Sequence, residues 1–259
     1  MAPNAIMIPF VPPLTIVVPA FNERDNLPRV LDDALVFARE RCRAAEILVV
    51  DDGSSDGSAA LLDELARTHA GALRVVRHEH NRGLTAALRT GFYGAGNDFV
   101  TWIPADGQIP LDELAKILDA WRDHDLVLST YRRRDDGLAR KILSRGLRLL
   151  LRATTGLVDR LEGVYLFRRA LLEELDLVAA QSAGAIGFEI AVKARRLGKV
   201  IGSTEIECAP RLSGQSNVAN ARNVAQSFAE LWRIRRSLGR MRASAPARGA
   251  RVDDGPKSP

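Results

Sequence analysis

The segment Phe99-Val100-Thr101-Trp102-Ile103-Pro104-Ala105-Asp106-Gly107-Gln108 joins an apolar, β-branched run to a carboxylate and a side-chain amide. A run of this kind, ending abruptly at polar residues, predicts a buried strand with polar side chains at its carboxyl end. In open α/β sheets, ligands bind at that end of the strands. Asp106 and Gln108 also offer the oxygen ligands that Mg2+ or Mn2+ takes together with substrate phosphate. The segment alone is also compatible with a strand and a simple turn.

Strands and helices alternate on both sides of this segment. Short apolar runs predict the strands, and apolar residues recurring every three or four positions predict the helices between them. The expected strands are 14–18, 47–50, 73–76, 99–103 and 126–129, and the expected helices lie near 27–38, 61–65, 84–94 and 111–118. Repeated strand-helix-strand units predict an α/β fold with a doubly wound, mostly parallel sheet.

Polar residues follow each of the first four predicted strands. Because the carboxyl ends of parallel strands meet at one edge of a sheet, we expect these residues to converge. No glycine-rich dinucleotide fingerprint follows the first strand, and no P-loop motif occurs, so neither of those nucleotide sites is expected. Asp52 could accept hydrogen bonds from a ribose or a base, or it could cap a turn or a helix. The four polar groups are Pro19–Glu23, Asp51–Asp52, His80–Gly83 and Ala105–Gln108.

The composition is that of a globular protein with an anionic partner. The chain has 259 residues, of which 46% are hydrophobic and 27% charged, which is enough to bury a full core. Its net charge of +5 favours nucleic acid, a phosphorylated substrate or an acidic membrane as partner. Cys42 and Cys208 are far apart and lack metal-ligand spacing, so we expect neither a disulfide nor a zinc site.

The first residues do not have the pattern of a secretory signal. Residues 1–13 are apolar but interrupted by four prolines, and they lack a basic start and a small-residue cleavage site. No uninterrupted apolar run approaches the ~20 residues that span a bilayer. We therefore expect a cytoplasmic protein.

Four ordered motifs resemble the signatures of family 2 glycosyltransferases, and especially of the branch that contains dolichol-phosphate mannose synthase and bacterial polyprenyl-phosphate sugar transferases. The similarity runs from about residue 14 to residue 216. It implies a GT-A type nucleotide-sugar-binding domain, a divalent metal (Mg2+ or Mn2+), and inverting transfer of a hexose from a GDP- or UDP-sugar to a polyprenyl phosphate. The motifs are 18–23 (VPAFNE), 49–57 (VVDDGSSDG), 81–87 (NRGLTAA) and 105–108 (ADGQ).

The resemblance assigns roles to residues of the first half of the chain. Asp106 and Gln108 would hold the metal against the donor diphosphate, and Asp106 is also a candidate catalytic residue. The family usually has an aspartate where this chain has Pro104, and proline cannot bind a metal. Asp106 is therefore the one carboxylate that this motif would bring to the metal. The donor-binding residues implied by the resemblance are Pro19, Phe21, Asn22, Glu23, Val50, Asp52, Gly83, Ala105, Asp106 and Gln108.

The second half supplies positive charge. The resemblance implies that a basic, amphipathic helix at about 138–156 faces the acceptor or the membrane; an ordinary surface helix with a leucine-rich core face has the same pattern. The resemblance places Asp159 at a position that, in the family, is proposed to lie near the attacking group of the acceptor. Arg211, in the family's terminal Arg-x-x-Gly-x-Ser pattern, would close over the diphosphate, since a planar bidentate donor suits phosphate. The acceptor- or phosphate-binding residues would be Arg132, Arg134, Ser144 and Arg145, and the catalytic candidates beside Asp106 are Arg132, Asp159 and Arg211.

The chain changes character after the transferase motifs. We expect a glycosyltransferase domain at 1–217, an amphipathic basic helix at 218–242 and a disordered tail at 243–259. Trp232 among arginines suits a peripheral helix on an anionic membrane, here the cytoplasmic face of the cell membrane. The same helix could instead cover the sheet or an interface in a homo-oligomer.

The sequence supports three alternative functions to different degrees. A nucleic-acid-binding module would need aromatic side chains among the basic residues, and the aromatic content is only 5% without such a pattern, so no nucleic-acid partner is expected. A transferase acting on a soluble sugar or small acceptor differs from the lipid-dependent enzyme only in its acceptor. A degenerate protein that binds a nucleotide sugar without turnover is suggested by Pro104.

Overall fold

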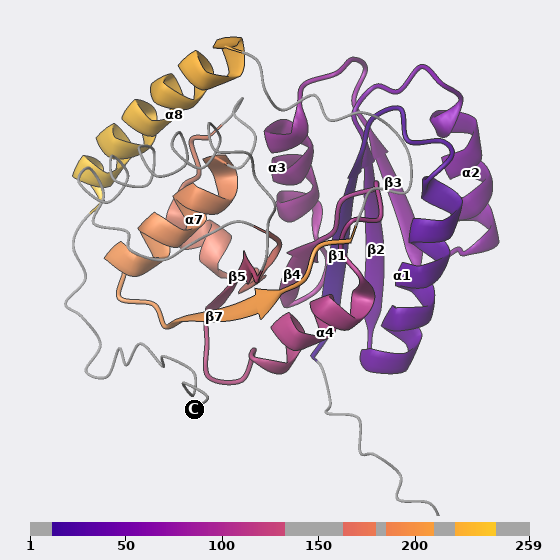
Figure 1. Ribbon diagram of the computed structural model, residues 1–259, viewed down its shortest axis with the longest axis horizontal. Helices are drawn as coiled ribbons and strands as arrows, with labels where there is room; N and C mark the ends of the chain where they lie inside the picture. Colours follow the sequence, from indigo (N-terminus) through magenta and orange to yellow (C-terminus); the bar gives the residue numbers. More distant parts are fainter. Residues whose placement is uncertain (1–11, 133–162, 180–184, 210–220, 242–259) are drawn as a thin grey trace, which may run out of the picture.

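A computed structural model describes residues 12–132, 163–179, 185–209 and 221–241, with side chains described from residue 230 onward in the last segment. Figure 1 shows the strands between two layers of helices. The strands are β1 Leu14–Ala20, β2 Ala45–Asp51, β3 Leu73–Arg77, β4 Phe99–Trp102, β5 Leu126–Tyr131, β6 Tyr165–Arg168 and β7 Ile201–Ile206. The helices are α1 Leu27–Arg41, α2 Ser58–Thr68, α3 Leu84–Gly94, α4 Leu111–Asp119, α6 Leu171–Leu175, α7 Ala185–Arg196 and α8 Ala221–Arg240.

The strands form one mixed sheet in the order β3-β2-β1-β4-β6-β5-β7. β1 pairs in parallel with β2 and β4, β2 with β3, and β5 with β7. β6 runs antiparallel to both of its neighbours, β4 and β5. Six strands therefore end at the same edge of the sheet. The expected α/β fold with a mostly parallel, doubly wound sheet is confirmed.

β1 is an interior strand between β2 and β4, and it accommodates a proline near its end. All seven of its residues are buried. Pro19 cannot donate a ladder hydrogen bond, but its nitrogen faces the side of β4, and β4 ends at Trp102, which pairs with Val17. The chain leaves that ladder at the next residue, where Ile103 N donates to Val17 O. Pro19 therefore lies where no partner strand needs its N–H.

The two faces of the sheet carry separate apolar cores. Successive residues of β1, such as Ile16 and Val17, point to opposite faces. One core joins the sheet to α1, α2 and α4, and the other joins it to α3, α6, α7 and α8. Burial on both faces explains why the parallel strands are almost continuously apolar.

α3 lies unusually close to the sheet because of a glycine. A Cβ on Gly91 would lie 2.3 Å from Val17 Cγ1. No other residue fits this point of the helix without movement of β1. Gly91 therefore allows α3 to lie close against β1.

α7 contains a buried ion pair that organises the preceding loop. Glu189 and Lys193, both at most 1% exposed, lie one helical turn apart with 2.6 Å between Oε1 and Nζ. The Glu189 carboxylate also accepts hydrogen bonds from the backbone N–H groups of Val178 (2.7 Å) and Ala179 (2.6 Å). Backbone donors and a cation together satisfy a charge that would otherwise be costly to bury.

α8 packs along α7 at the outer side of this layer (Figure 1). Ile234 and Leu238 are buried against the core, whereas Trp232 is 56% exposed and Arg236 lies over its ring at 3.7 Å. From residue 230 onward the helix thus has a buried apolar side and an exposed side. Across the described segments, no helix has the length and apolarity that a membrane span needs.

Candidate active site at the carboxyl ends of the parallel strands

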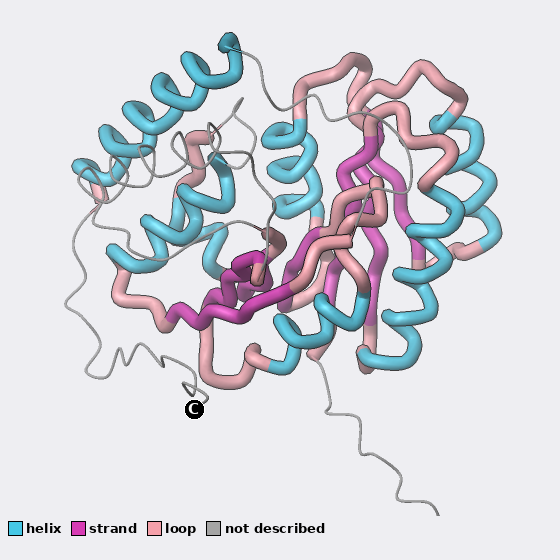
Figure 2. Tube along the Cα trace, viewed as in Figure 1, coloured by secondary structure: helices cyan, strands magenta, loops and turns pink. Residues whose placement is uncertain are grey.

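The loops after β1, β2 and β3 gather at one end of the strands, as Figure 2 shows in pink. We call them together the strand-end rim: residues 21–24, 52–57 and 78–83. Hydrogen bonds between the first two loops are direct. Asn22 N donates to Ser54 Oγ at 2.9 Å, and Asn22 Oδ1 accepts from Ser55 N at 2.8 Å. Asn22 has a φ of 56°, a left-handed conformation that asparagine tolerates better than most residues.

The second and third loops of the strand-end rim touch through backbone. Gly53 has a φ of 75°, and a Cβ there would lie 2.6 Å from the carbonyl carbon of His80. Glycine is required both by the conformation and by this close approach. The glycine of the second motif thus allows the loops after β2 and β3 to form one continuous surface.

Asp52 is the anchor of the strand-end rim. Its side chain is 4% exposed, and Oδ1 lies 2.6 Å from Nδ1 of the buried His78. Oδ1 also accepts from Arg82 N at 3.0 Å and Oδ2 from Gly83 N at 2.7 Å, directly before α3. Asp52 therefore fixes the loop that leads into α3, and its contact with a nucleoside stays a prediction. His78 was not singled out from the sequence, because its partner is 26 residues away.

The other predicted donor residues lie on or just below the strand-end rim. Phe21 is 42% exposed beside Asn22, and Val50 is fully buried in the core beneath. Glu23 Oε2 accepts from Asn26 Nδ2 at 2.6 Å. At the start of α2, Asp56 Oδ1 accepts from Ser58 N at 2.9 Å. The structure gathers these residues at one end of the sheet, and their contacts with a donor remain predictions.

Asp106 and Gln108 lie in the turn that follows β4, next to the end of β1. Gly107, with a φ of 70°, makes the turn, and Asp106 Oδ1 accepts from Gln108 N at 3.1 Å. Gln108 O accepts from Ala209 N at 2.9 Å, which joins this turn to the segment after β7. Asp106 and Ala105 are only 6% and 3% exposed. These hydrogen bonds thus hold the backbone of Asp106 and Gln108, the candidate metal ligands, in place.

The residues present fit a divalent metal that is held jointly with a substrate. Within the described segments, no cluster of three or more His, Cys, Asp or Glu side chains forms a metal cage. Mg2+ commonly takes one or two carboxylates and completes its shell with water and phosphate oxygens, and Mn2+ favours the same oxygen ligands. One carboxylate and one amide at the carboxyl edge suit that mode of binding.

Arg132 lies at the end of β5, beside the end of β7. Its guanidinium is 3.8 Å from Glu205 Oε2 and 3.6 Å from Glu207 Oε1, and its side chain is 66% exposed. Glu113 of α4 joins the same corner by accepting from Glu207 N at 3.0 Å. Burial acts to raise the pKa of Glu113, but hydrogen bonds from Lys116 and from Glu207 N outweigh it and lower the pKa. This corner is therefore rich in charge.

Several predicted residues lie outside the described segments. The acceptor helix at about 138–156 and the tail at 243–259 belong to this group. The individual residues in it are Arg134, Ser144, Arg145, Asp159 and Arg211.

Strand order, the antiparallel β6 and a polar rim at the carboxyl edge define the class: the fold is that of the GT-A glycosyltransferases. The chain belongs to glycosyl transferase family 2, whose model matches residues 15–176. It is also similar to a mannosyltransferase of Pyrobaculum calidifontis solved in complex with GDP-Man and Mn2+, with a TM-score of 0.62, 26% identity, and coverage of 86% of this chain and 65% of that one.

Two curated relatives are similar over different lengths. A polyprenol monophosphomannose synthase of Mycolicibacterium smegmatis is 33% identical over 242 residues, which is 88% of this chain and 89% of the relative. An undecaprenyl-phosphate 4-deoxy-4-formamido-L-arabinose transferase of Pectobacterium carotovorum subsp. carotovorum (strain PC1) is 34% identical over 151 residues, 58% of this chain. The chain spans about half the length of that second relative, 46%.

Proposed function

We propose that this chain is an inverting glycosyltransferase that moves a hexose from a GDP- or UDP-sugar to a polyprenyl phosphate. The observation that carries the proposal is the turn with Asp106 and Gln108 on a GT-A sheet, beside a rim of hydrogen-bonded loops. The similarity to a polyprenol monophosphomannose synthase over nearly the whole of both chains supports a polyprenyl phosphate acceptor.

The proposed reaction depends mainly on positioning the two substrates and neutralising their negative charge. A phosphate monoester has its second pKa near ~6 and is largely dianionic at neutral pH, so it needs little help from a general base. The acceptor oxygen must attack the sugar C1 in line with the departing nucleoside diphosphate. The negatively charged donor diphosphate and acceptor phosphate must therefore be brought together in a preorganised, water-poor site.

The strand-end rim and the Asp106 turn would bind different parts of the donor. The rim, with Pro19, Phe21, Asn22 and Glu23 from β1 and its loop, would hold the nucleoside. Asp106 and Gln108 would hold the divalent metal, which supplies charge stabilisation for the diphosphate when bound. Ala105 and Gly83, both small, would let the donor approach the backbone closely.

Arg132 is a suitable phosphate ligand although it faces two glutamates. Exposed ion pairs contribute only about 0–1 kcal/mol, so turning the guanidinium from Glu205 and Glu207 toward a phosphate would cost little. Arg134, Ser144, Arg145, Asp159 and Arg211 complete the proposed acceptor and diphosphate contacts.

We also propose that α8 attaches the enzyme reversibly to the cytoplasmic face of the cell membrane. Its exposed Trp232 is stacked under Arg236, and Arg233 and Arg240 line the same outer surface. Tryptophan prefers the membrane interface, and juxtamembrane arginines are attracted to anionic lipid. Flotation with vesicles containing phosphatidylglycerol tests this: Trp232→Ala should reduce binding, and salt should weaken it. Equal binding to neutral and anionic vesicles would contradict it.

The substrate proposal is tested by screening labelled GDP- and UDP-hexoses with a short polyprenyl phosphate, in Mn2+, in Mg2+ and in EDTA. We expect label to enter the organic phase only with both the lipid phosphate and a divalent metal. Transfer to a soluble sugar without the lipid would support the soluble-acceptor alternative. Nucleotide-sugar binding without any turnover would support the degenerate protein suggested by Pro104. Neither binding nor transfer with any donor would overturn the proposal.

A further inference from the structure

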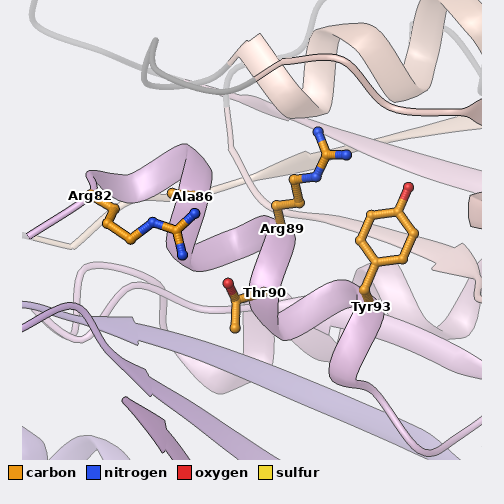
Figure 3. A pocket seen from close by; sticks show the side chains of 5 residues that line it. All are labelled: Arg82, Ala86, Arg89, Thr90 and Tyr93. Atoms are coloured by element: carbon orange, nitrogen blue, oxygen red, sulfur yellow. The ribbon is translucent and has the colours of Figure 1, made fainter. Parts of the chain in front are cut away.

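A polar pocket lies on the side of α3 and shares Arg82 with the strand-end rim (Figure 3). Its volume is about 400 Å³, near the lower end of the range for small-molecule sites. We call it the α3 pocket, and its lining residues are Arg82, Ala86, Arg89, Thr90 and Tyr93.

The α3 pocket carries two guanidinium groups and no carboxylate among its lining residues. Arg82 lies directly before Gly83, the N-cap of α3, and Arg89 lies in the second turn of the helix, with the small Ala86 between them (Figure 3). In the segments that the structure describes, neither guanidinium forms an ion pair with an acidic side chain. Their charges are therefore available to an anion that enters over Ala86.

Arg89 is held in place rather than extended into solvent. Its guanidinium lies 5.6 Å from the centroid of the Tyr93 ring, and Nη1 donates to Ala179 O at 3.4 Å. Ala179 is itself fixed, because its N–H donates to the buried Glu189 carboxylate at 2.6 Å. The ion pair inside α7 thus determines where the Arg89 guanidinium lies.

The opposite end of the α3 pocket is anchored by the strand-end rim. Thr90 Oγ1 lies 2.9 Å from Nε2 of His78, and Nδ1 of the same ring lies 2.6 Å from Asp52 Oδ1. Asp52 also binds the N–H of Arg82. Two pocket residues are therefore positioned by the carboxylate that organises the rim, which makes the α3 pocket a preorganised site next to the proposed donor site.

We propose that the α3 pocket binds a phosphate group, at a site separate from the donor diphosphate. Planar, bidentate guanidinium groups match phosphate oxygens, and stacking on Tyr93 keeps one of them oriented. The exposed Leu84 and Tyr93, 38% and 48% accessible, offer apolar surface to whatever carries the phosphate. The bound phosphate group belongs either to a lipid phosphate or to free inorganic phosphate. Only the assignment to a lipid rests on the proposed function; the proposal of a phosphate site does not.

Calorimetric titration of the full chain tests the inference, with inorganic phosphate and with geranyl phosphate, in EDTA so that no metal recruits phosphate to Asp106. The variant is Arg82→Gln/Arg89→Gln, and the matched control is Arg29→Gln, an exposed arginine of α1 paired only with Asp33 in the described structure. We expect the double variant to bind geranyl phosphate at least ~10-fold more weakly, since hydrogen bonds to charged groups are lost, and the control to bind like wild type.

The outcomes separate the two sources and the two proposals. Tight binding of geranyl phosphate alone identifies a lipid phosphate, and equal binding of inorganic phosphate identifies free phosphate; both support the site if they depend on the arginines. Equal affinity of wild type, control and double variant overturns it. If the double variant unfolds, Arg82→Gln and Arg89→Lys are titrated singly, and each must weaken binding. Arginine-dependent phosphate binding without any sugar transfer would leave the α3 pocket standing while the proposed function fails.

Discussion

Replacing Gly91 by alanine should destabilise the protein, although alanine is the better helix former. The new Cβ would lie 2.3 Å from Val17 Cγ1 and 3.1 Å from Cγ2, and Val17 is fully buried in the interior strand β1. Overpacking a core costs about 1–3 kcal/mol, whereas exchanging glycine for alanine in a helix interior recovers about 1 kcal/mol. With two close contacts against a rigid strand, we expect a net loss of about 1–2 kcal/mol in the free energy of unfolding.

Urea unfolding, followed by circular dichroism, measures this loss against a matched control. Gly94→Ala lies in the same helix, but its Cβ would meet only Leu48 Cδ2, at an ordinary 3.5 Å. We expect that variant to be as stable as wild type or slightly more so. In a double-mutant cycle, Val17→Ala should relieve the clash, giving a coupling of about 1–3 kcal/mol. Equal effects at Gly91 and Gly94, together with additivity in the cycle, would refute the reasoning.

Three further predictions concern side chains whose contacts are defined. Asp52→Asn should lower the free energy of unfolding by about 1.5–3 kcal/mol, because it replaces a charged acceptor of two backbone N–H groups; an unchanged urea midpoint would contradict this. Burial acts to raise the pKa of Glu46, but hydrogen bonds, first that of Arg74, lower it below its usual value. The ionised Glu46 carboxylate therefore stabilises the fold fully above its unfolded pKa of about 4.3, and this stabilisation is lost as pH falls through the lower folded pKa. Glu46→Gln should flatten the dependence of the free energy of unfolding on pH in that acidic range. Burial raises the pKa of Cys42 to about 11, so iodoacetamide at pH 8 should label the exposed Cys208 far faster, as peptide mass spectrometry would show.

Much of the fold could be predicted because its elements follow local patterns. The bounds predicted for α3, residues 84–94, agree with the structure, since an apolar stripe begins directly after Gly83. The antiparallel direction of β6 could not be predicted in this way. Its four residues carry no periodicity that distinguishes one direction from the other, and their direction follows from pairing with β4 and β5.

The candidate site was predicted at the level of loops rather than contacts. Motif order correctly brought the polar groups to one edge of the sheet, because parallel strands end there. The partners of Asp52 could not be read from the sequence, since His78 and Gly83 become its neighbours only when the strands pair. Arg89 was not singled out from the sequence. The available signal was the spacing of two arginines by seven positions across a small alanine, 82 to 89 around 86.

Metal-dependent nucleotide binding tests the central claim most directly. Calorimetric titration with GDP and UDP, with and without Mn2+, compares wild type with Asp106→Asn and with Asp123→Asn, an exposed carboxylate between α4 and β5 as control. We expect Mn2+ to strengthen binding of one nucleotide at least ~10-fold in wild type and in the control, as a shared phosphate–metal–carboxylate contact requires. In Asp106→Asn that gain should disappear while metal-free binding is unchanged. An undiminished response of Asp106→Asn to Mn2+ would contradict the assignment of the donor site to this turn.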